Sequence, residues 1–367
     1  MTKHLFFLLG IVLFACNPEK KSEKAAKIDF FHTVDTVQID AGNHLFFLGF
    51  GLTQPRLSPD ERYLFFYDNI AHAIEKVDLI NRKYVQTIDL DKEGPKGMSW
   101  LQDYVVKANQ TFHIVSPRNY VALDTNGELL EFSEKFDDIF KVSEEKKLFQ
   151  ALRISPDLQY LFGLTSNFNQ KQMLGWIDMK DSIYREAEID SMSYRNELGI
   201  NISNVNMNSF IDADYLNEKI TVFHGDGIDL YTLDPKTGKM IFHDYNTKLI
   251  EKRRPGNYPK NVESGTKDSK NAMELWNKEI TFRSIVFNSK DRHYYRIATK
   301  WTESQSIKDI PHQYLLIFNE DLSLLHEEDL SDFPAKIFTY FVSNGKLWIH
   351  NREKEDLEFF VFDFSIN

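Results

Sequence analysis

The first feature with a recognisable chemistry is a basic segment, residues 246–279, in an otherwise acidic chain of 367 residues with a formal net charge of −11. Arg253 and Arg254 are adjacent in it, and guanidinium groups suit the recognition of an anionic or sugar ligand. Tyr258 and Trp276 lie in the same segment, where an aromatic ring could stack on such a ligand. The segment therefore has two interpretations. It is either a lid that holds these four residues over a ligand, or a solvated loop that Trp276 attaches to the rest of the protein.

Four further residues are binding candidates because of their type and position. Trp301 and His312 flank a neighbouring connection, where they would either complete the same pocket or pack as ordinary loop residues. His224 and Asp226 belong to the sequence His-Gly-Asp-Gly, in which either side chain could serve as a general base or a metal ligand. Glycine and aspartate are equally typical of turns. The sequence assigns no catalytic residue.

Motifs of known chemistry are incomplete or missing. Residues 89–100 begin like a calcium-binding loop, but the twelfth position is Trp100, where a glutamate is required. The sequence has no HExxH metal motif, no phosphate-binding loop and no GxSxG nucleophile elbow. Cys16 is the single cysteine, which excludes disulfide bonds within the chain and thiolate zinc sites. We therefore expect neither a metal site nor a cofactor.

The elements that must position these residues form a repeat. The clearest unit, residues 56–91, has short alternating strands of five to seven residues separated by turns. Its opening pattern, Arg-Leu-Ser-Pro-Asp at 56–60, recurs as Arg-Ile-Ser-Pro-Asp at 153–157. One four-stranded unit buries too little apolar surface to fold alone, so the copies must stack or close into a ring. After the first unit at about 52–90, the others occupy about 98–132, 148–189, 207–245, 280–329 and 336–364.

A polar residue marks the end of the third strand in each unit. We interpret it as a turn residue whose side chain bonds to its own backbone, which makes it useful as a marker of the repeat. The markers are Asp78, Asp124, Asp178, Asp234, Asn319 and Asp363.

The last unit lacks a fourth strand, whereas residues 34–40 have the pattern of a strand without a neighbouring partner. An N-terminal strand that completes the last sheet would close the ring and hide its edges. The sequence therefore predicts an all-β fold, a six-bladed β-propeller of four-stranded antiparallel blades that strand 34–40 closes. The domain would span 28–367, with a loop insertion at about 246–279.

The connections in such a disc alternate between its two faces. Turns from the first to the second strand and from the third to the fourth are short, and they define the short-turn face. The other connections are long and define the long-loop face; they include 133–147, 190–208, 246–279 and 301–312. Long loops on a rigid scaffold usually carry binding residues. We expect the ligand site on the long-loop face, at the mouth of the central channel.

The N-terminal residues 1–16 read as a targeting segment, with a positive start and a short apolar core. They end in Leu-Phe-Ala-Cys, which resembles a bacterial lipobox and implies that Cys16 carries more than one acyl chain. Residues 17–27 are charged and would form a flexible tether. A plain secretory signal and an N-terminal membrane anchor are the alternatives.

With these features the chain resembles the TolB-like six-bladed β-propeller lipoproteins of Bacteroidota, many of which are domains of unknown function. The resemblance rests on Cys16, on the two Ser-Pro-Asp turns and on residues 91–97, which look like the Gly-Pro-rich link between early blades. It implies an anchor in the outer membrane, and no agreed catalytic residues come with it. Members at the cell surface tend to carry acidic residues after the cysteine. Here Lys20 and Lys21 follow Glu19, which favours the periplasmic face.

The predicted function is a binding module, anchored through Cys16, for a peptide, a glycan or a protein partner. An acidic, mixed surface argues against nucleic acid as a partner. The alternative is a carbohydrate-active hydrolase or lyase at the channel mouth, which two carboxylates roughly 5–10 Å apart would favour. A third reading is a structural subunit, which a wide apolar patch would favour.

Overall fold

The computed structural model describes residues 30–93, 97–98, 101–116, 119–133, 147–166, 172–301 and 310–366. The expected signal segment 1–16 with Cys16 and the tether 17–27 lie outside these residues. The middle of the link at 91–97, Trp100, and most of the connections 133–147 and 301–312 lie outside them as well.

In the described ranges the strands form seven sheets, of which six are four-stranded and antiparallel. The first sheet consists of β2 (Thr53–Leu57), β3 (Tyr63–Asp68), β4 (Ala73–Asp78) and β5 (Lys83–Asp89). The second consists of β6 (Asp103–Val106), β7 (Phe112–Val115), β8 (Tyr120–Leu123) and β9 (Leu129–Ser133). The third consists of β10 (Lys147–Ile154), β11 (Tyr160–Ser166), β12 (Gln172–Asp178) and β13 (Ile183–Glu188).

The remaining four-stranded sheets follow in chain order. The fourth consists of β16 (Ile211–Leu216), β17 (Lys219–His224), β18 (Leu230–Asp234) and β19 (Lys239–His243). The fifth consists of β21 (Thr281–Asn288), β22 (His293–Lys300), β23 (His312–Phe318) and β24 (Leu324–Asp329). The sixth consists of β25 (Tyr340–Ser343), β26 (Lys346–His350), β27 (Glu358–Ile366) and β1 (Phe30–Gln38). These sheets occupy the positions of the repeated units, so the four-stranded repeat is confirmed.

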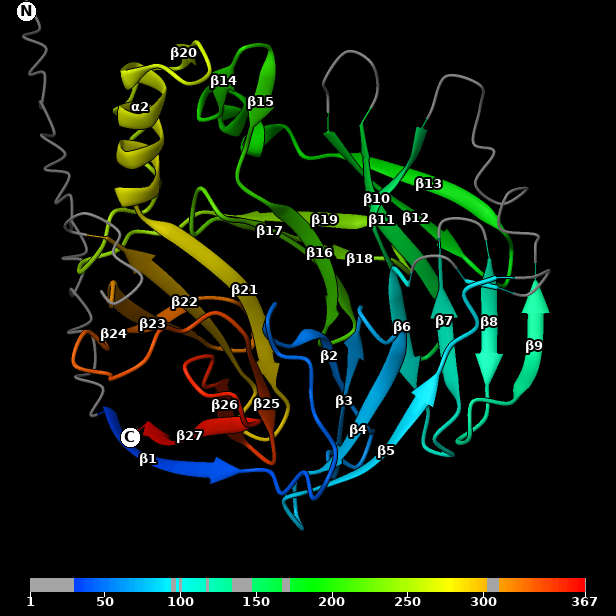
Figure 1. The fold of residues 1–367 in the computed structure, drawn as a ribbon. Helices are drawn as coiled ribbons and strands as arrows, with labels where there is room; N and C mark the ends of the chain where they lie inside the picture. The colour runs from blue at the N-terminus through cyan, green and yellow to red at the C-terminus, as the bar shows by residue number, and fades with distance from the viewer. Residues whose placement is uncertain are drawn as a thin grey trace, which may run out of the picture.

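One strand of each four-stranded sheet lies toward the middle of the molecule; these inner strands are β2, β6, β10, β16, β21 and β25 (Figure 1). These inner strands touch in sequence order: β2 meets β6, β6 meets β10, β10 meets β16, β16 meets β21, and β21 meets β25. An apolar cluster fills each interface between successive sheets. The sixth and first sheets also share one, in which Trp348 and Phe359 pack with Phe66 and Val77.

The N-terminal strand β1 is the outer strand of the sixth sheet. It pairs antiparallel with β27 along its whole length, from Phe30 opposite Ile366 to Gln38 opposite Glu358. The strand begins and ends earlier than the expected 34–40. Ile39 and Asp40 then continue toward the first sheet, where the Asp40 carbonyl accepts from the Tyr84 amide at 2.8 Å.

The turns follow from local side-chain chemistry. Ser58 Oγ accepts from the Tyr63 amide at 2.9 Å, and Ser155 Oγ accepts from the Tyr160 amide at 2.8 Å, so the two Ser-Pro-Asp turns have the same geometry. The interpretation of the strand-end markers as turn residues is confirmed for five of the six. Each accepts backbone N–H groups of its own turn: Asp78, Asp124, Asp178, Asp234 and Asn319. Asp363 differs because it lies inside β27 and pairs with Lys346 at 2.8 Å.

The segment 246–279 was expected as a loop insertion, but it contains regular structure. Helix α2 (Lys267–Lys278) begins at Thr266, whose hydroxyl accepts from the Ser269 amide at 3.1 Å. Strand β20 (Asn261–Val262) pairs with β14 (Ile200–Ile202), which also pairs with β15 (Val205–Met207). A small cluster of Ile200, Tyr258 and Ala272 joins this three-stranded sheet to α2 at one edge of the molecule (Figure 1). No helix in the described part of the chain is long and apolar enough to cross a membrane.

Candidate functional site

The basic pair and the His-Gly-Asp-Gly sequence meet through their backbones. Strand β17 ends at His224, and the segment after it lies beside residues 252–254. The Arg254 amide donates to the Asp226 carbonyl at 2.8 Å, and the Ile228 amide donates to the Lys252 carbonyl at 3.0 Å. This short pairing brings together side chains that are more than twenty residues apart in the sequence.

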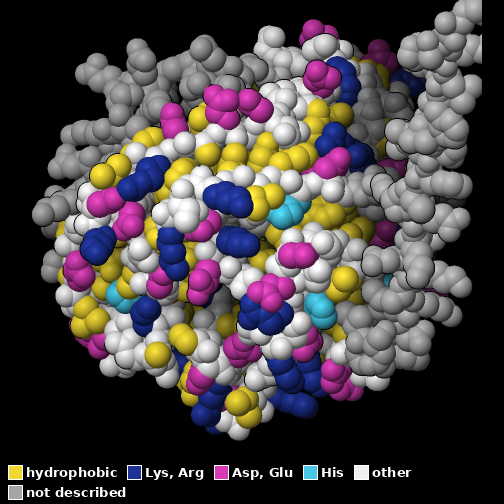
Figure 2. Space-filling view, turned by 180° about the vertical axis from the view of Figure 1, so that it is seen from behind, with side chains coloured by type: hydrophobic (Ala, Val, Ile, Leu, Met, Phe, Trp, Pro, Cys, Tyr) yellow, Lys and Arg dark blue, Asp and Glu magenta, His cyan; other side chains and the backbone are white. Residues whose placement is uncertain are grey.

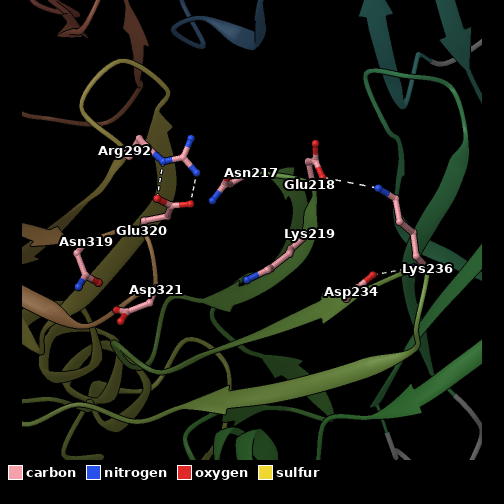
Figure 3. A pocket seen from close by; sticks show the side chains of 9 residues that line it. All are labelled: Asn217, Glu218, Lys219, Asp234, Lys236, Arg292, Asn319, Glu320 and Asp321. Atoms are coloured by element: carbon pink, nitrogen blue, oxygen red, sulfur yellow. Dashed lines mark hydrogen bonds and ion pairs between the residues drawn. The ribbon is translucent and has the colours of Figure 1, made fainter.

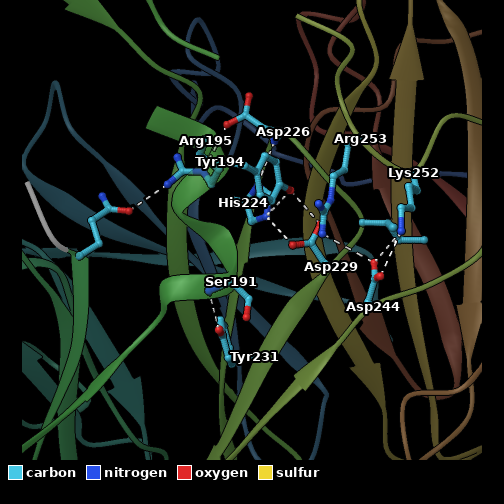
Figure 4. Close-up of polar contacts among 12 residues, drawn as sticks. Ser191, Tyr194, Arg195, His224, Asp226, Asp229, Tyr231, Asp244, Lys252 and Arg253 are labelled. Atoms are coloured by element: carbon cyan, nitrogen blue, oxygen red, sulfur yellow. Dashed lines mark hydrogen bonds and ion pairs between the residues drawn. The ribbon is translucent and has the colours of Figure 1, made fainter. Parts of the chain in front are cut away.

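Tyr194, His224, Asp229 and Arg253 form the first part of the cluster (Figure 4). Tyr194 comes from the 3-10 helix η1 (Asp190–Glu197), and its hydroxyl donates to Asp229 Oδ1 at 2.8 Å. His224 Nε2 lies 3.6 Å from the other carboxylate oxygen. Arg253 lies with its guanidinium carbon 4.1 Å from the centre of the Tyr194 ring and its Nε 3.4 Å from Asp229 Oδ1.

Burial sets the protonation of this group. It lowers the pKa of His224, which favours the neutral imidazole. Burial alone would raise the pKa of Asp229, but the neighbouring His224, the hydrogen bond from Tyr194 and the charge of Arg253 outweigh it and lower that pKa. The side chains of His224 and Asp229 are 0 % exposed. A histidine and a carboxylate sealed in this way hold the connections of the long-loop face together and are not accessible to a substrate.

Asp226 anchors the second part of the cluster between two arginines. Arg195 Nε lies 3.2 Å from Asp226 Oδ2, and Arg254 Nε lies 3.3 Å from Oδ1. The guanidinium of Arg254 also donates to the Trp276 carbonyl at 2.9 Å and to Thr281 Oγ1 at 2.8 Å. Arg254 is therefore buried and paired within the protein, whereas the Arg253 side chain is 33 % exposed.

The other candidates from the sequence lie around this cluster. Tyr258 is buried, and its hydroxyl donates to the Leu198 carbonyl at 2.6 Å. The Trp276 ring lies 4.4 Å from the guanidinium carbon of Arg254. Trp301 lines a separate pocket of about 390 Å³ beside α2. His312 is exposed on β23, with its Nδ1 3.0 Å from Ser331 Oγ. The structure thus gathers Arg253, Arg254, Tyr258, Trp276, His224 and Asp226, and leaves Trp301 and His312 apart.

Gly227 allows the cluster to close. A Cβ atom at this position would collide with the Tyr194 hydroxyl and lie 2.5 Å from Asp229 Oδ1. We expect Gly227→Ala to lower the free energy of unfolding by about 2 kcal/mol, the usual cost of overpacking, in urea unfolding curves. Adding Tyr194→Phe removes one of the two collisions and should restore part of the loss. A Gly227→Ala protein as stable as the wild type would contradict this geometry.

A second polar group lies on the inner strands, and the sequence analysis did not identify it. We call Arg56, Asp103, Arg153, Asp212 and Asp214 the inner-strand girdle. Arg56 pairs with Asp103 at 2.6 Å, and Arg153 pairs with Asp212 at 2.7 Å. The side chains of Arg56, Arg153 and Asp212 stay 25 %, 17 % and 26 % exposed. The sequence does contain a signal for this group, because Arg56 and Arg153 each open a copy of the repeated Arg-x-Ser-Pro-Asp pattern.

The inner strands are irregular beside these arginines. The register of β2 shifts between Thr53 and Arg56, and that of β10 shifts between Gln150 and Arg153. Strand β21 has a similar shift between Phe282 and Ile285, around Arg283. Bulges redirect side chains and are common next to binding sites. In the described ranges, no three histidine, cysteine or acidic side chains gather in a group that could hold a metal ion.

The larger pocket, of about 760 Å³, lies among the turns of the short-turn face in the fourth and fifth sheets (Figure 3). Its lining is almost entirely polar and includes the ion pairs of Arg292 with Glu320 and of Lys236 with Glu218. All four side chains are about half exposed or more, so these pairs contribute little to stability or to a fixed shape. The predicted position of the site on the long-loop face therefore stays a prediction.

His350 lies at the long-loop end of β26, where it is buried beside Gly51. Burial, together with the nearby Arg352 charge, lowers the pKa of His350 to about 4. The unfolded chain binds this proton near pH 6.5, so the stability of the folded protein should fall as the pH drops from about 6.5 toward 4. We expect this one group to account for about 3 kcal/mol across that interval.

The measurement is the free energy of unfolding from urea curves between pH 7 and pH 4. His350→Leu should flatten the decline, and His312→Leu, at an exposed position, should keep it. An equal decline in wild type and His350→Leu would show that His350 does not carry the effect.

Known proteins resemble this chain in family and in overall fold. A family model described as "Domain of unknown function (DUF4221)" matches residues 27–329. A crystal structure of a DUF4221 member from Bacteroides vulgatus is similar, with 14 % identity and a TM-score of 0.65, over 94 % of this chain and 99 % of that one. The β-propeller domain of Cps50 (Swd1) from Myceliophteria thermophila is a more distant likeness, with 9 % identity and a TM-score of 0.39, over 90 % of this chain and 99 % of that one.

No curated protein matches the sequence. The family model covers most of the chain, and the Bacteroides vulgatus structure covers nearly all of it. The chain therefore belongs to the DUF4221 family, whose defining domain is of unknown function.

Proposed function

We propose that this protein is a non-catalytic binding module, a six-bladed β-propeller whose ring is closed where β1 pairs with β27. Its ligand would be a peptide, a glycan or a partner protein, held on the long-loop face. The observation that carries the proposal is a group of exposed aromatic side chains in the connection from β1 to β2. Phe47 and Phe50 are 41 % and 64 % exposed, with their ring centres 5.9 Å apart in an edge-to-face arrangement.

Exposed aromatic rings favour binding because they bury a large apolar area on contact. The connection is held at Gly49, whose carbonyl accepts from Arg352 Nη2 at 3.1 Å. Leu45, in the same connection, is 89 % exposed. An aromatic group fixed to the scaffold in this way loses little conformational entropy when a ligand covers it.

The test is a binding screen of residues 28–367 against defined panels of oligosaccharides and peptides. Phe50→Ser should weaken the best hit about tenfold, which is the loss of roughly 1.4 kcal/mol of contact. Ile80→Ser is the matched control, because Ile80 is also 64 % exposed but lies in a turn of the short-turn face. Loss of binding with Ile80→Ser and not with Phe50→Ser would place the ligand on the wrong face for this proposal.

A carbohydrate-active hydrolase or lyase is the second candidate, and one observation favours it. Asp212 and Asp214 are two residues apart on β16, and such side chains share a side of the strand with Cα atoms about 7 Å apart. Burial raises the pKa of Asp212, although the charge of Arg153 opposes it. Two carboxylates at such a spacing, one of them with a raised pKa, could act as acid and base. Cleavage of an oligosaccharide that Asp212→Asn abolishes would favour this function, and the absence of cleavage would exclude it for that panel.

The proposal includes an outer-membrane anchor through acyl chains on Cys16, with the domain on the periplasmic face. The support is the lipobox-like sequence that ends at Cys16. Cys16→Ala should move the protein from the membrane fraction to the soluble fraction. A variant that stays fully membrane-bound would contradict the anchor.

Nucleic acid is not a proposed partner. The chain carries 55 acidic and 44 basic residues, and the two kinds are interspersed over the face seen in Figure 2. A chain with this excess of acidic residues repels a polyanion overall.

A further inference from the structure

Arg283 occupies a fixed position near the long-loop end of β21. It lies in the bulge between Phe282 and Ile285, where the backbone departs from regular pairing. The carbonyl of Arg283 accepts from Arg296 Nε at 2.8 Å, and the carbonyl of Ser284 accepts from the Tyr340 hydroxyl. Two buried side chains thus hold the bulge in place. The direction of the Arg283 side chain is therefore set by the scaffold.

The guanidinium of Arg283 makes no hydrogen bond and no ion pair among the described residues. Its Nε is enclosed and makes no hydrogen bond, and no acidic side chain forms an ion pair with it. Burial lowers its pKa, since desolvation disfavours the charged form. An arginine nevertheless keeps its charge at neutral pH. Arg56 and Arg153 differ, because each has an aspartate partner.

A second arginine lies near the same aromatic ring. The Phe338 ring centre is 4.9 Å from the guanidinium carbon of Arg283 and 5.3 Å from that of Arg352. These distances keep the two guanidinium carbons within about 10 Å of each other. Phe338 is half-buried and Arg352 is exposed, so the group reaches the surface. Two like charges at this range, without an acid between them, leave a local positive potential that an anion would neutralise.

The exposed aromatic pair adjoins this group. Arg352 donates to the carbonyl of Gly49, which lies between Phe47 and Phe50. The positive group and the apolar rings are therefore neighbours, joined through Arg352. A ligand that fits it has an anionic group and an apolar or ring-shaped body.

We propose that Arg283 and Arg352 bind the oxyanion of a small ligand, a carboxylate or a phosphate, whose body lies against Phe47 and Phe50. The inference rests on the proposed binding function and specifies its ligand class. Guanidinium groups bind carboxylates and phosphates in the same way, through paired N–H donors.

The test uses residues 28–367 and three probes at constant ionic strength: sodium glucuronate, glucose and inorganic phosphate. Isothermal titration calorimetry should detect binding of glucuronate, of phosphate or of both to the wild type. Arg283→Met should weaken it about tenfold or more, the loss of one charge-assisted contact. Arg292→Met is the control, because Arg292 lies on the short-turn face and pairs with Glu320.

The outcomes distinguish a carboxylate ligand from a phosphate ligand. Binding of glucuronate alone identifies a carboxylate ligand, and binding of phosphate alone identifies a phosphate ligand. The inference is overturned if neither anion binds, or if Arg283→Met binds them as the wild type does. Equal binding of glucose and glucuronate, unaffected by Arg283→Met, would overturn the oxyanion site and leave the proposed binding function standing.

A stability measurement shows whether weakened binding by Arg283→Met comes from the site or from a destabilised fold. Because Arg283 has no acid partner, Arg283→Met leaves no carboxylate unpaired and removes a desolvated charge. We expect the melting temperature of Arg283→Met to equal or exceed that of the wild type. Weakened anion binding in a variant of undiminished stability would come from the site itself. A lower melting temperature would instead assign Arg283 to the support of the fold.

Discussion

Replacing Arg296 with methionine should lower the free energy of unfolding by about 3 kcal/mol or more. Arg296 is 0 % exposed, and its three donor nitrogens bond to the carbonyls of Arg283, Ile228 and His224 at 2.8, 2.8 and 2.6 Å. Methionine fills much of the volume but removes the donors of three carbonyls, two of them in buried bonds. Burial lowers the pKa of Arg296 to about 10, which still leaves it charged at neutral pH.

Urea unfolding at neutral pH measures this effect, with Arg292→Met as the matched control. Arg292 lies in the turn directly before β22, the strand that carries Arg296. Its side chain is exposed and pairs with Glu320. Its loss should change the free energy of unfolding by less than about 1 kcal/mol. The bonds of Arg296 join the fourth sheet to the bulge of β21, so equal effects of the two substitutions would mean that this bridge does not stabilise the fold.

Deleting residues 28–41 should destabilise the domain by at least about 3 kcal/mol, because the deletion exposes the edge of β27. The nine residue pairs between β1 and β27 are lost. The link from Asp40 to the first sheet is lost with them. Thermal unfolding of the shortened chain, and its tendency to aggregate through the free edge, are the measurements. An unchanged melting temperature would contradict closure of the ring by this strand.

Two valines of β1 provide a more conservative form of the same test. Val37 is 5 % exposed and packs in the cluster shared by the sixth and first sheets, whereas Val34 is 40 % exposed. Val37→Asp buries a charge and should cost about 3 kcal/mol, and Val34→Asp should be nearly neutral. The comparison separates loss of packing from a general intolerance of charge on this strand.

The parts of the fold that could be predicted from sequence depend on local chemistry. Ser58 and Asp78 form hydrogen bonds with residues only a few positions away in the sequence. The turns, and the strands between them, therefore give a repeat that can be recognised in the sequence. The bounds of the four-stranded sheets follow from this repetition. The arginines of the Arg-x-Ser-Pro-Asp pattern were visible in the same way, and their place on the inner strands is a consequence of the turn that follows them.

The parts that could not be predicted depend on contacts between distant segments. Strand β20 consists of two residues and pairs with β14 about sixty residues earlier, a contact that has no periodicity to reveal it. Helix α2 carries many charges, which obscured the apolar face that Met273, Leu275 and Trp276 turn toward Ile200. Of the candidates chosen by residue type, Arg253 and Arg254 meet the segment of His224 and Asp226, while Trp301 and His312 lie apart from it. Only the contacts show that Arg254 pairs with Asp226 inside the protein, whereas Arg283 has no acidic partner among the described residues.

Hydrogen–deuterium exchange of residues 28–367, with and without sodium glucuronate, tests most directly whether the long-loop face binds the ligand. The account predicts slower exchange in the connection 41–52, at the start of β21 and in the segment 335–340 before β25. Slower exchange confined to the turns around Asn217, Asp234 and Glu320 would place the ligand in the pocket of the short-turn face and would contradict it.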